Sequence, residues 1–111
     1  MEEFRATDCL QVKIDKNTAT SHVLVAGTTG KRILVVGLML VVGASAVNVT
    51  FEDEDGTDIT GPLPFGANGG VVLHRNIKDG HFHVPTSGKG LNMLLSGAVQ
   101  ASGILSYRLI D

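Results

Sequence analysis

Apolar and polar residues alternate with a period of two along much of this 111-residue chain. The alternation is clearest in residues 9–15, 20–26 and 46–52. Successive side chains of a β-strand point to opposite faces of a sheet, so this period is typical of strands that are buried on one face. The apolar residues that share one face are Leu10, Val12 and Ile14 in the first stretch, Val23 and Val25 in the second, and Val47, Val49 and Phe51 in the third.

The stretch GTTGKRILVVGLMLVVG, residues 27–43, combines a glycine pair, a lysine and an apolar run, and three kinds of structure compete for it. A phosphate-binding loop needs glycine at position 25 and Ser or Thr at position 32, where this chain has Val25 and Arg32. A membrane-spanning helix needs about 20 apolar residues. The run from Ile33 to Val42 supplies only ten before the sequence turns polar. We therefore predict a strand over residues 31–42.

This predicted strand is apolar at nearly every position rather than at every second one. Such a strand is buried on both faces, so we expect one face to pack on the core and the other on a neighbouring subunit. The pattern does not say which face is which. We assign the subunit interface to Leu34, Val36, Leu38 and Leu40. The expected assembly is a homotrimer of about 35 kDa, three times the chain mass of 11.6 kDa.

Glycine- and asparagine-rich turns separate these stretches from later ones. Further strands are expected over residues 71–75, 81–84, 90–95 and 98–109. About eight short strands at this spacing predict an all-β fold, an antiparallel β-sandwich of the jelly-roll type. Residues 60–70 are expected to cross between the sheets, and Gly103 to mark a bulge or a close approach of backbones. Residues 9–111 then form a single domain, and residues 1–8 form an N-terminal arm.

The composition changes this picture little. The chain is 43% hydrophobic and 18% charged, with a formal net charge of −2, and its basic residues form no stripe that would neutralise nucleic acid. Cys9 is the only cysteine, which excludes an internal disulfide. Glu2 and Glu3 stand where a secretory signal would carry basic residues, so we expect synthesis in the cytoplasm and no membrane partner.

His81 and His83 are the most tempting metal ligands, because residues i and i+2 of a strand point the same way. Small jelly-roll metalloenzymes of the cupin type add a carboxylate shortly after such a pair, whereas Val84 and Pro85 follow here. The simpler interpretation places both histidines on the outer or subunit-facing side of a strand whose Phe82 packs on the core. We predict no bound transition metal and no cofactor, with a metal shared on a symmetry axis as the alternative.

The acidic run EDED, residues 52–55, does not have the spacing of a helix–loop–helix calcium site, which needs glycine at its sixth position and an acid at its twelfth. We interpret the run as a solvated hairpin tip at the Asp55-Gly56 turn. No serine, histidine and aspartate are spaced as a catalytic set, and Cys9 is best interpreted as a small apolar filler. The sequence therefore predicts that the protein is not an enzyme.

The last two thirds of the chain resemble a module that recurs in small structural proteins of tailed bacteriophages. The likeness covers residues 46–111 and consists of turn and strand signatures. These are Gly61-Pro62-Leu63-Pro64, Asn68-Gly69-Gly70, Gly90-Leu91-Asn92, Leu95-Ser96, Val99-Gln100, Ser102-Gly103 and Tyr107. Where the module tends to have an aromatic residue directly after Asp-Gly, this chain has His81-Phe82, so the aromatic residue is displaced by one position.

The resemblance implies a jelly-roll protein of the virion, above all a head decoration (cement) protein that assembles as a trimer. Such a protein is made in the host cytoplasm, binds the major capsid protein on the outer surface of the head and stabilises it. Phe4 and Arg5 of the arm are the expected capsid-binding residues. The alternatives are a phage fibre or tail-associated module, a carbohydrate-binding jelly roll and, less favoured, a small cupin-like metalloprotein.

Overall fold

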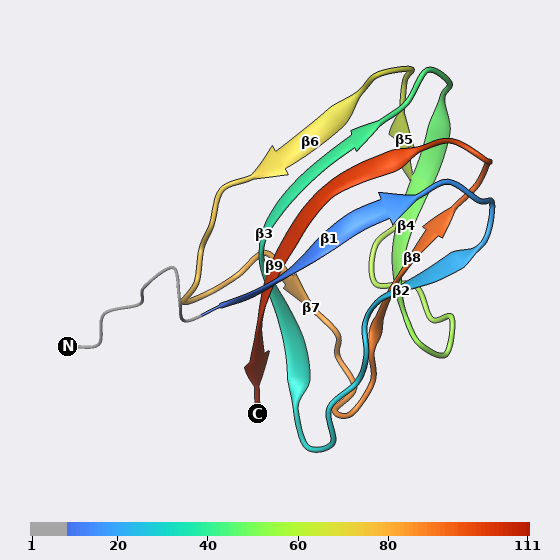
Figure 1. Ribbon diagram of the computed structural model, residues 1–111. Helices are drawn as coiled ribbons and strands as arrows, with labels where there is room; N and C mark the ends of the chain where they lie inside the picture. The colour runs from blue at the N-terminus through green and yellow to red at the C-terminus, as the bar shows by residue number, and fades with distance from the viewer. Residues whose placement is uncertain (1–8) are drawn as a thin grey trace.

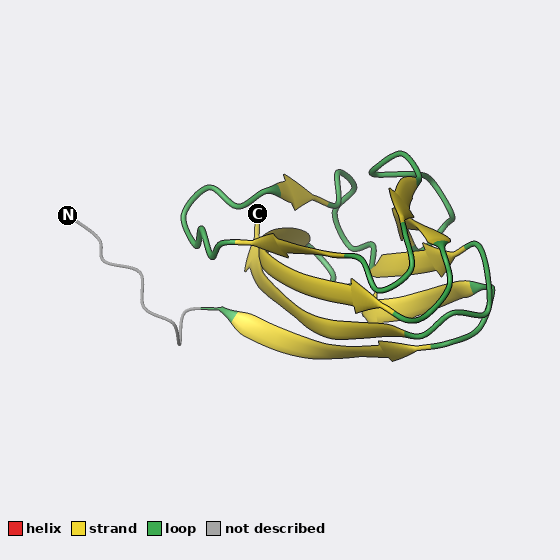
Figure 2. Ribbon diagram, turned by 90° about the horizontal axis from the view of Figure 1, so that it is seen from above, coloured by secondary structure: helices red, strands yellow, loops and turns green. Residues whose placement is uncertain are grey.

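The computed structural model describes residues 9–111 and folds them into two antiparallel β-sheets packed face to face (Figures 1 and 2). The strands are β1 (Leu10–Lys16), β2 (Ser21–Val25), β3 (Arg32–Val42), β4 (Val47–Asp53), β5 (Leu63–Phe65), β6 (Gly70–Leu73), β7 (Phe82–His83), β8 (Leu91–Leu95) and β9 (Ala101–Ile110). This confirms the predicted all-β antiparallel sandwich. No helix within the described residues is long and apolar enough to span a membrane.

The strand order is that of a jelly roll, because strands pair from the ends of the chain inward. β1 pairs with β9, β2 with β8, β3 with β6, and β4 with β5, all antiparallel. These pairs alternate between the two sheets, whose orders are β1-β9-β3-β6 and β2-β8-β4-β5. The two-residue strand β7 is an addition to this plan and lies beside the first half of β3.

The core between the sheets is aliphatic, with a small aromatic centre. Phe51 on β4 is the largest fully buried side chain, and its ring centroid lies 5.4 Å from that of Phe82 on β7. Around this pair pack Val, Leu and Ile side chains from both sheets, among them Ile14, Leu91 and Leu105. Burial of apolar surface, worth roughly 25 cal/mol per Å², drives this packing. Phe82, which is partly buried, therefore packs against the core as expected.

The long strand β3 contains a β-bulge, because its register with β9 shifts between Val35 and Gly37. The extra residue reverses the alternation of side chains at this point. The residues of β3 that belong to the core cluster are Ile33, Val35, Leu38, Leu40 and Val42. Odd-numbered residues therefore face the core before the bulge, and even-numbered residues face it afterwards.

The sequence-based boundaries differ from the structure mainly at short elements. Residues 60–70, expected to be irregular, contain the three-residue strand β5, which pairs with β4 through Pro64 opposite Asn48. In β2 the expected inward face is wrong at one position, because Val23 is 61% exposed while Leu24 is buried. A register shift between Val23 and Val25 explains how Val25 is nevertheless buried.

Gly103 on β9 is a close-approach site, as expected. A β-carbon added there would lie 1.8 Å from the carbonyl oxygen of Met39 on the neighbouring strand β3. Any side chain would force the backbones of β3 and β9 apart. Glycine at this position therefore permits the closest contact between the two central strands of the first sheet.

Candidate interaction surface

The four residues predicted to form the subunit interface lie buried within the single chain. Val36 and Leu40 are 0% exposed, and Leu34 and Leu38 are 6% and 5% exposed. The bulge also splits the set, because Leu38 and Leu40 belong to the core cluster and the other two do not. Leu34 is covered by the loop between β6 and β7, where Gly80 packs against it. These side chains offer little surface to a neighbour in the single chain, and their role in a subunit interface stays a prediction.

The apolar surface of the first sheet comes instead from residues that lie one position away. Met39 and Val41 on β3 are 46% and 48% exposed, Val72 on β6 is 64% exposed, and Ile104 on β9 is 40% exposed. We call these four residues the apolar stripe. They point away from the sandwich core, because Met39 and Val41 alternate with the core residues Leu38, Leu40 and Val42 of β3.

Strand register brings members of the stripe into one row. Ile104 pairs with Met39, and Met39 pairs with Val72, so three apolar side chains stand beside one another across β9, β3 and β6. On the far side of β9, Lys13 of β1 pairs with Ile104 and ends the row with a charge. The outer face of this sheet is thus apolar toward β6 and charged toward β1, which are its two edge strands.

A hollow of about 300 Å³ adjoins the stripe on the same face. It is lined by Gly37, which has no side chain, by Met39, Val72 and Ile104 of the stripe, and by Arg75, among others. The glycine at the bulge therefore leaves a recess in an otherwise continuous sheet surface. An apolar side chain of a binding partner would fit such a recess.

The two histidines considered as candidate metal ligands do not converge with further ligands among the described residues. His83 is exposed, and the His81 ring nitrogen Nε2 lies 2.7 Å from the carbonyl oxygen of His74. No group of three or more His, Cys, Asp or Glu residues in this part of the chain is arranged to hold a metal. The prediction that no metal is bound stays a prediction.

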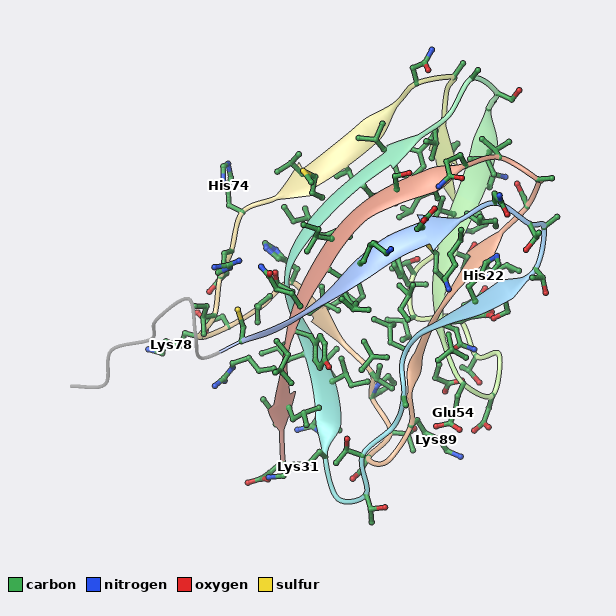
Figure 3. The ribbon with its side chains drawn as sticks, viewed as in Figure 1. His22, Lys31, Glu54, His74, Lys78 and Lys89 are labelled. Carbon is green, nitrogen blue, oxygen red and sulfur yellow. The ribbon has the colours of Figure 1, made fainter. Side chains whose placement is uncertain are left out.

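A second, wide hollow follows the loop between β6 and β7. It has a volume of about 590 Å³, and its lining is basic, with His74, Arg75, Lys78 and His81. Figure 3 shows His74 and Lys78 projecting from this part of the chain. The hollow is open to solvent, and its charge would suit an acidic partner.

The acidic run 52–55 is tied into the fold rather than solvated. Glu52 and Asp53 are 6% and 5% exposed. The Glu52 carboxylate accepts a hydrogen bond from the Ser21 hydroxyl at 2.5 Å, and Asp53 Oδ1 accepts from the amides of Asp55 and Thr57 at 2.9 and 3.0 Å. The expectation of a solvated tip is therefore wrong for the first half of the run.

The second half of the run holds the loop before β8. Glu54 Oε1 accepts a hydrogen bond from the Gly90 amide at 2.7 Å, and Asp55 forms an ion pair of 3.0 Å with Lys89 (Figure 3). The hydrogen bond to Asp55 raises the pKa of Lys89 above its ordinary value. These carboxylates therefore join two loops, and they form no cation site in the described part of the chain.

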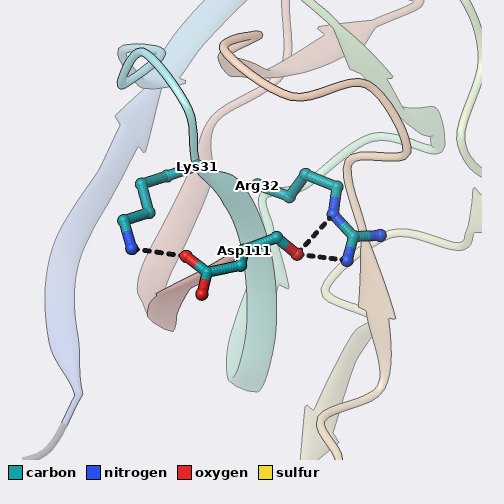
Figure 4. Close-up of polar contacts among 3 residues, drawn as sticks. All are labelled: Lys31, Arg32 and Asp111. Atoms are coloured by element: carbon teal, nitrogen blue, oxygen red, sulfur yellow. Dashed lines mark hydrogen bonds and ion pairs between the residues drawn. The ribbon is translucent and has the colours of Figure 1, made fainter.

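The end of β9 is held by basic residues at the start of β3. Lys31 Nζ lies 2.6 Å from Asp111 Oδ1, and Arg32 donates hydrogen bonds to the backbone oxygen of Asp111 (Figure 4). The hydrogen bond and charge of Lys31 lower the pKa of the Asp111 carboxyl group. This contact joins the end of β9 to the start of β3 and so holds the two central strands in register at that end.

Phe4 and Arg5, the expected capsid-binding residues, lie outside the described residues. Cys9, expected as an apolar filler, is only partly buried. Of the motifs in residues 46–111 that resemble phage modules, Asn68-Gly69-Gly70 forms the turn before β6, where Asn68 adopts a φ of 60°.

Comparison of the chain with models of protein families, with curated proteins and with solved structures finds no match in any of the three.

Proposed function

We propose that this protein is a structural component of a tailed-phage virion, a decoration protein that binds the outside of the head and stabilises it. The observation that carries an assembly role is the apolar stripe on the open face of the first sheet. Contiguous apolar surface on a small domain marks a site of protein–protein contact. The phage setting rests on the resemblance of residues 46–111 to modules of virion proteins.

The partner in this proposal is the major capsid protein, and the location is the capsid surface after synthesis in the host cytoplasm. Packed DNA pushes outward on the shell, so a protein that bridges capsid subunits resists their separation. An oligomer touches several capsid subunits at once, and after the first contact the others form at high effective concentration. The homotrimer of about 35 kDa, three times 11.6 kDa, stays a prediction that now rests on the resemblance alone.

The test of the proposed function mixes purified protein with undecorated phage heads and sediments them. We expect the protein to pellet with the heads and decorated heads to survive heating that breaks bare heads. Deletion of residues 1–8 is expected to leave a folded protein that stays in the supernatant, and Phe4→Ala to weaken binding without loss of stability. Intact protein that stays in the supernatant, or decorated heads that break as readily as bare ones, would contradict the proposal.

One observation favours a second function, carbohydrate binding. A hollow of about 240 Å³ on the second sheet is lined by Val23, Glu54 and Asn92, among others. Asn92 is 8% exposed, and its buried Oδ1 atom accepts no hydrogen bond from residues 9–111. Because this oxygen has almost no exposed surface, a sugar hydroxyl reaches it only after the side chains above it move aside. Glycan-array binding that is lost in Asn92→Ala would favour this alternative over decoration.

A further inference from the structure

The exposed edges of the two sheets differ in how they resist pairing with another strand. An edge strand presents unpaired amide and carbonyl groups, and proteins protect such edges with charges, proline, bulges or short strands. β1 carries Lys13, Asp15 and Lys16, and β5 contains Pro64. β2 is interrupted by a register shift, and β7 has only two residues.

The edge formed by β6 is short, with four residues, but it has no charge, proline or bulge to protect it. Its sequence, Gly70–Leu73, contains no charge and no proline, and it pairs with β3 in an unbroken register. Among the described strands β6 has no second neighbour, so its other edge is open (Figure 1). Of the five edges, this one is suited to strand pairing.

The hydrogen bonding of β6 identifies the groups that face the open edge. The Val42 amide donates to the Gly69 carbonyl oxygen at 2.8 Å. Hydrogen-bonded and non-hydrogen-bonded pairs alternate along an antiparallel ladder, so the amide and carbonyl groups of Val71 and Leu73 point toward β3. Those of Val72 point away from β3, toward solvent. Val72 is also the most exposed member of the apolar stripe, at 64%.

We propose that two copies of this chain pair antiparallel through their β6 edges, with Val72 of each copy opposite Val72 of the other across a two-fold axis. The two Val72 residues then exchange both of their backbone hydrogen bonds. The apolar row becomes continuous across the axis, running Ile104, Met39, Val72 in one copy and the same three residues in reverse order in the other. Lys13 stands at each end of this row.

A second copy fits this edge better than an unrelated strand for two reasons. Identical edges do not repel each other, and the joined sheet has no further edge that is open to pairing. The strand brings no charge to the axis, so two identical edges meet without like-charge repulsion. After pairing, the outer edges of the joined sheet are the two β1 strands, whose lysine and aspartate residues stop further growth. The contact is self-complementary, as a two-fold interface must be.

This inference is independent of the proposed function, because it concerns how copies join and not what they bind. A self-complementary edge closes as a dimer, so it competes with the trimer that the resemblance implies. The surface involved, four side chains and one short strand, is small for an obligate interface. We therefore expect a dimer that dissociates on dilution.

The test is sedimentation equilibrium of the full chain from about 1 µM to about 1 mM. We expect the mass to rise with concentration from 11.6 kDa toward about 23 kDa, twice the chain mass. Val72→Lys places two like charges against each other at the axis and is expected to weaken dimerisation at least about tenfold. Val72→Pro removes the amide that points outward and is expected to do the same while keeping the ladder to β3.

The matched control is Val23→Lys, the same substitution on a 61% exposed edge valine of the other sheet. It is expected to dimerise as the unsubstituted chain does, and circular dichroism checks that all variants are folded. A mass of 11.6 kDa at every concentration, or a trimer of about 35 kDa, would overturn the inference. So would a Val72→Lys dimer as strong as the original, or equal dissociation by Val23→Lys. None of these measurements involves phage heads, so failure here is distinct from failure of decoration.

Discussion

The two faces of β3 differ in what their apolar side chains do, although the sequence of the strand is apolar on both. Leu40 is fully buried against the second sheet, while Met39, its neighbour in the chain, is 46% exposed on the outer face. One face therefore holds the sandwich together, and the other offers a surface for contact. The comparison teaches that hydrophobicity alone does not separate a core residue from an interface residue.

Substitution on the two faces should give the largest contrast. Leu40→Ala removes a 0% exposed side chain from the core and is expected to lower the free energy of unfolding by about 2–5 kcal/mol. Met39→Ala, one position away, is expected to change it by less than about 1 kcal/mol. Urea denaturation followed by circular dichroism measures both, at a concentration low enough to keep the chain monomeric. Equal losses in the two variants would show that both faces are core.

The backbone contact beneath the stripe gives a second, smaller contrast. Gly103→Ala places a methyl group 1.8 Å from the Met39 carbonyl oxygen, so β9 and β3 must separate, at an expected cost of about 1–3 kcal/mol. Gly61→Ala is the control, because a β-carbon there meets nothing within 4 Å. Thermal unfolding of the two variants provides the measurement. A Gly103→Ala protein as stable as the control would mean that β3 and β9 separate at little cost in free energy.

The smallest expected effect is at the end of the same strand pair. Because Lys31 lowers the pKa of Asp111, this contact stabilises the fold above the ordinary aspartate pKa of 3.8, and the stabilisation is lost as the pH falls through the lowered pKa. Both side chains are largely exposed, so salt weakens the contact. Asp111→Asn is expected to leave the melting temperature at pH 7 nearly unchanged and to reduce its decline below pH 3.8. A large drop in melting temperature at pH 7 would indicate that the contact between Lys31 and Asp111 contributes more to stability than expected.

Strand positions and fold class could be predicted because they depend on local pattern. The alternation in residues 9–15 and 46–52 corresponds to β1 and β4, and the apolar run to β3. The jelly-roll order followed from the number and spacing of strands, and Gly103 was identified by its place inside a strand. The three-residue strand β5 escaped prediction, because so short a segment shows no period and contains proline.

Which side chains of β3 stay exposed could not be assigned from the pattern, and the physical reason is one added residue. Leu34, Val36, Leu38 and Leu40 have the same parity, so a strict period of two places them on one face. The bulge between Val35 and Gly37 adds a residue to β3 without adding one to β9, and everything beyond it changes face. No local signal in an apolar run of this kind marks where the extra residue goes.

The sequence by itself determined that this chain forms strands, where the longer ones lie, and that their apolar content suffices for a sandwich. These properties depend on side-chain period and turn residues, which act over a few positions. Only the tertiary structure decided which apolar residues are core, which form the stripe, and which edge lacks protection. Those properties depend on register between strands such as β3 and β9, whose paired residues range from Val42 and Ala101, 59 positions apart, to Arg32 and Ile110, 78 positions apart.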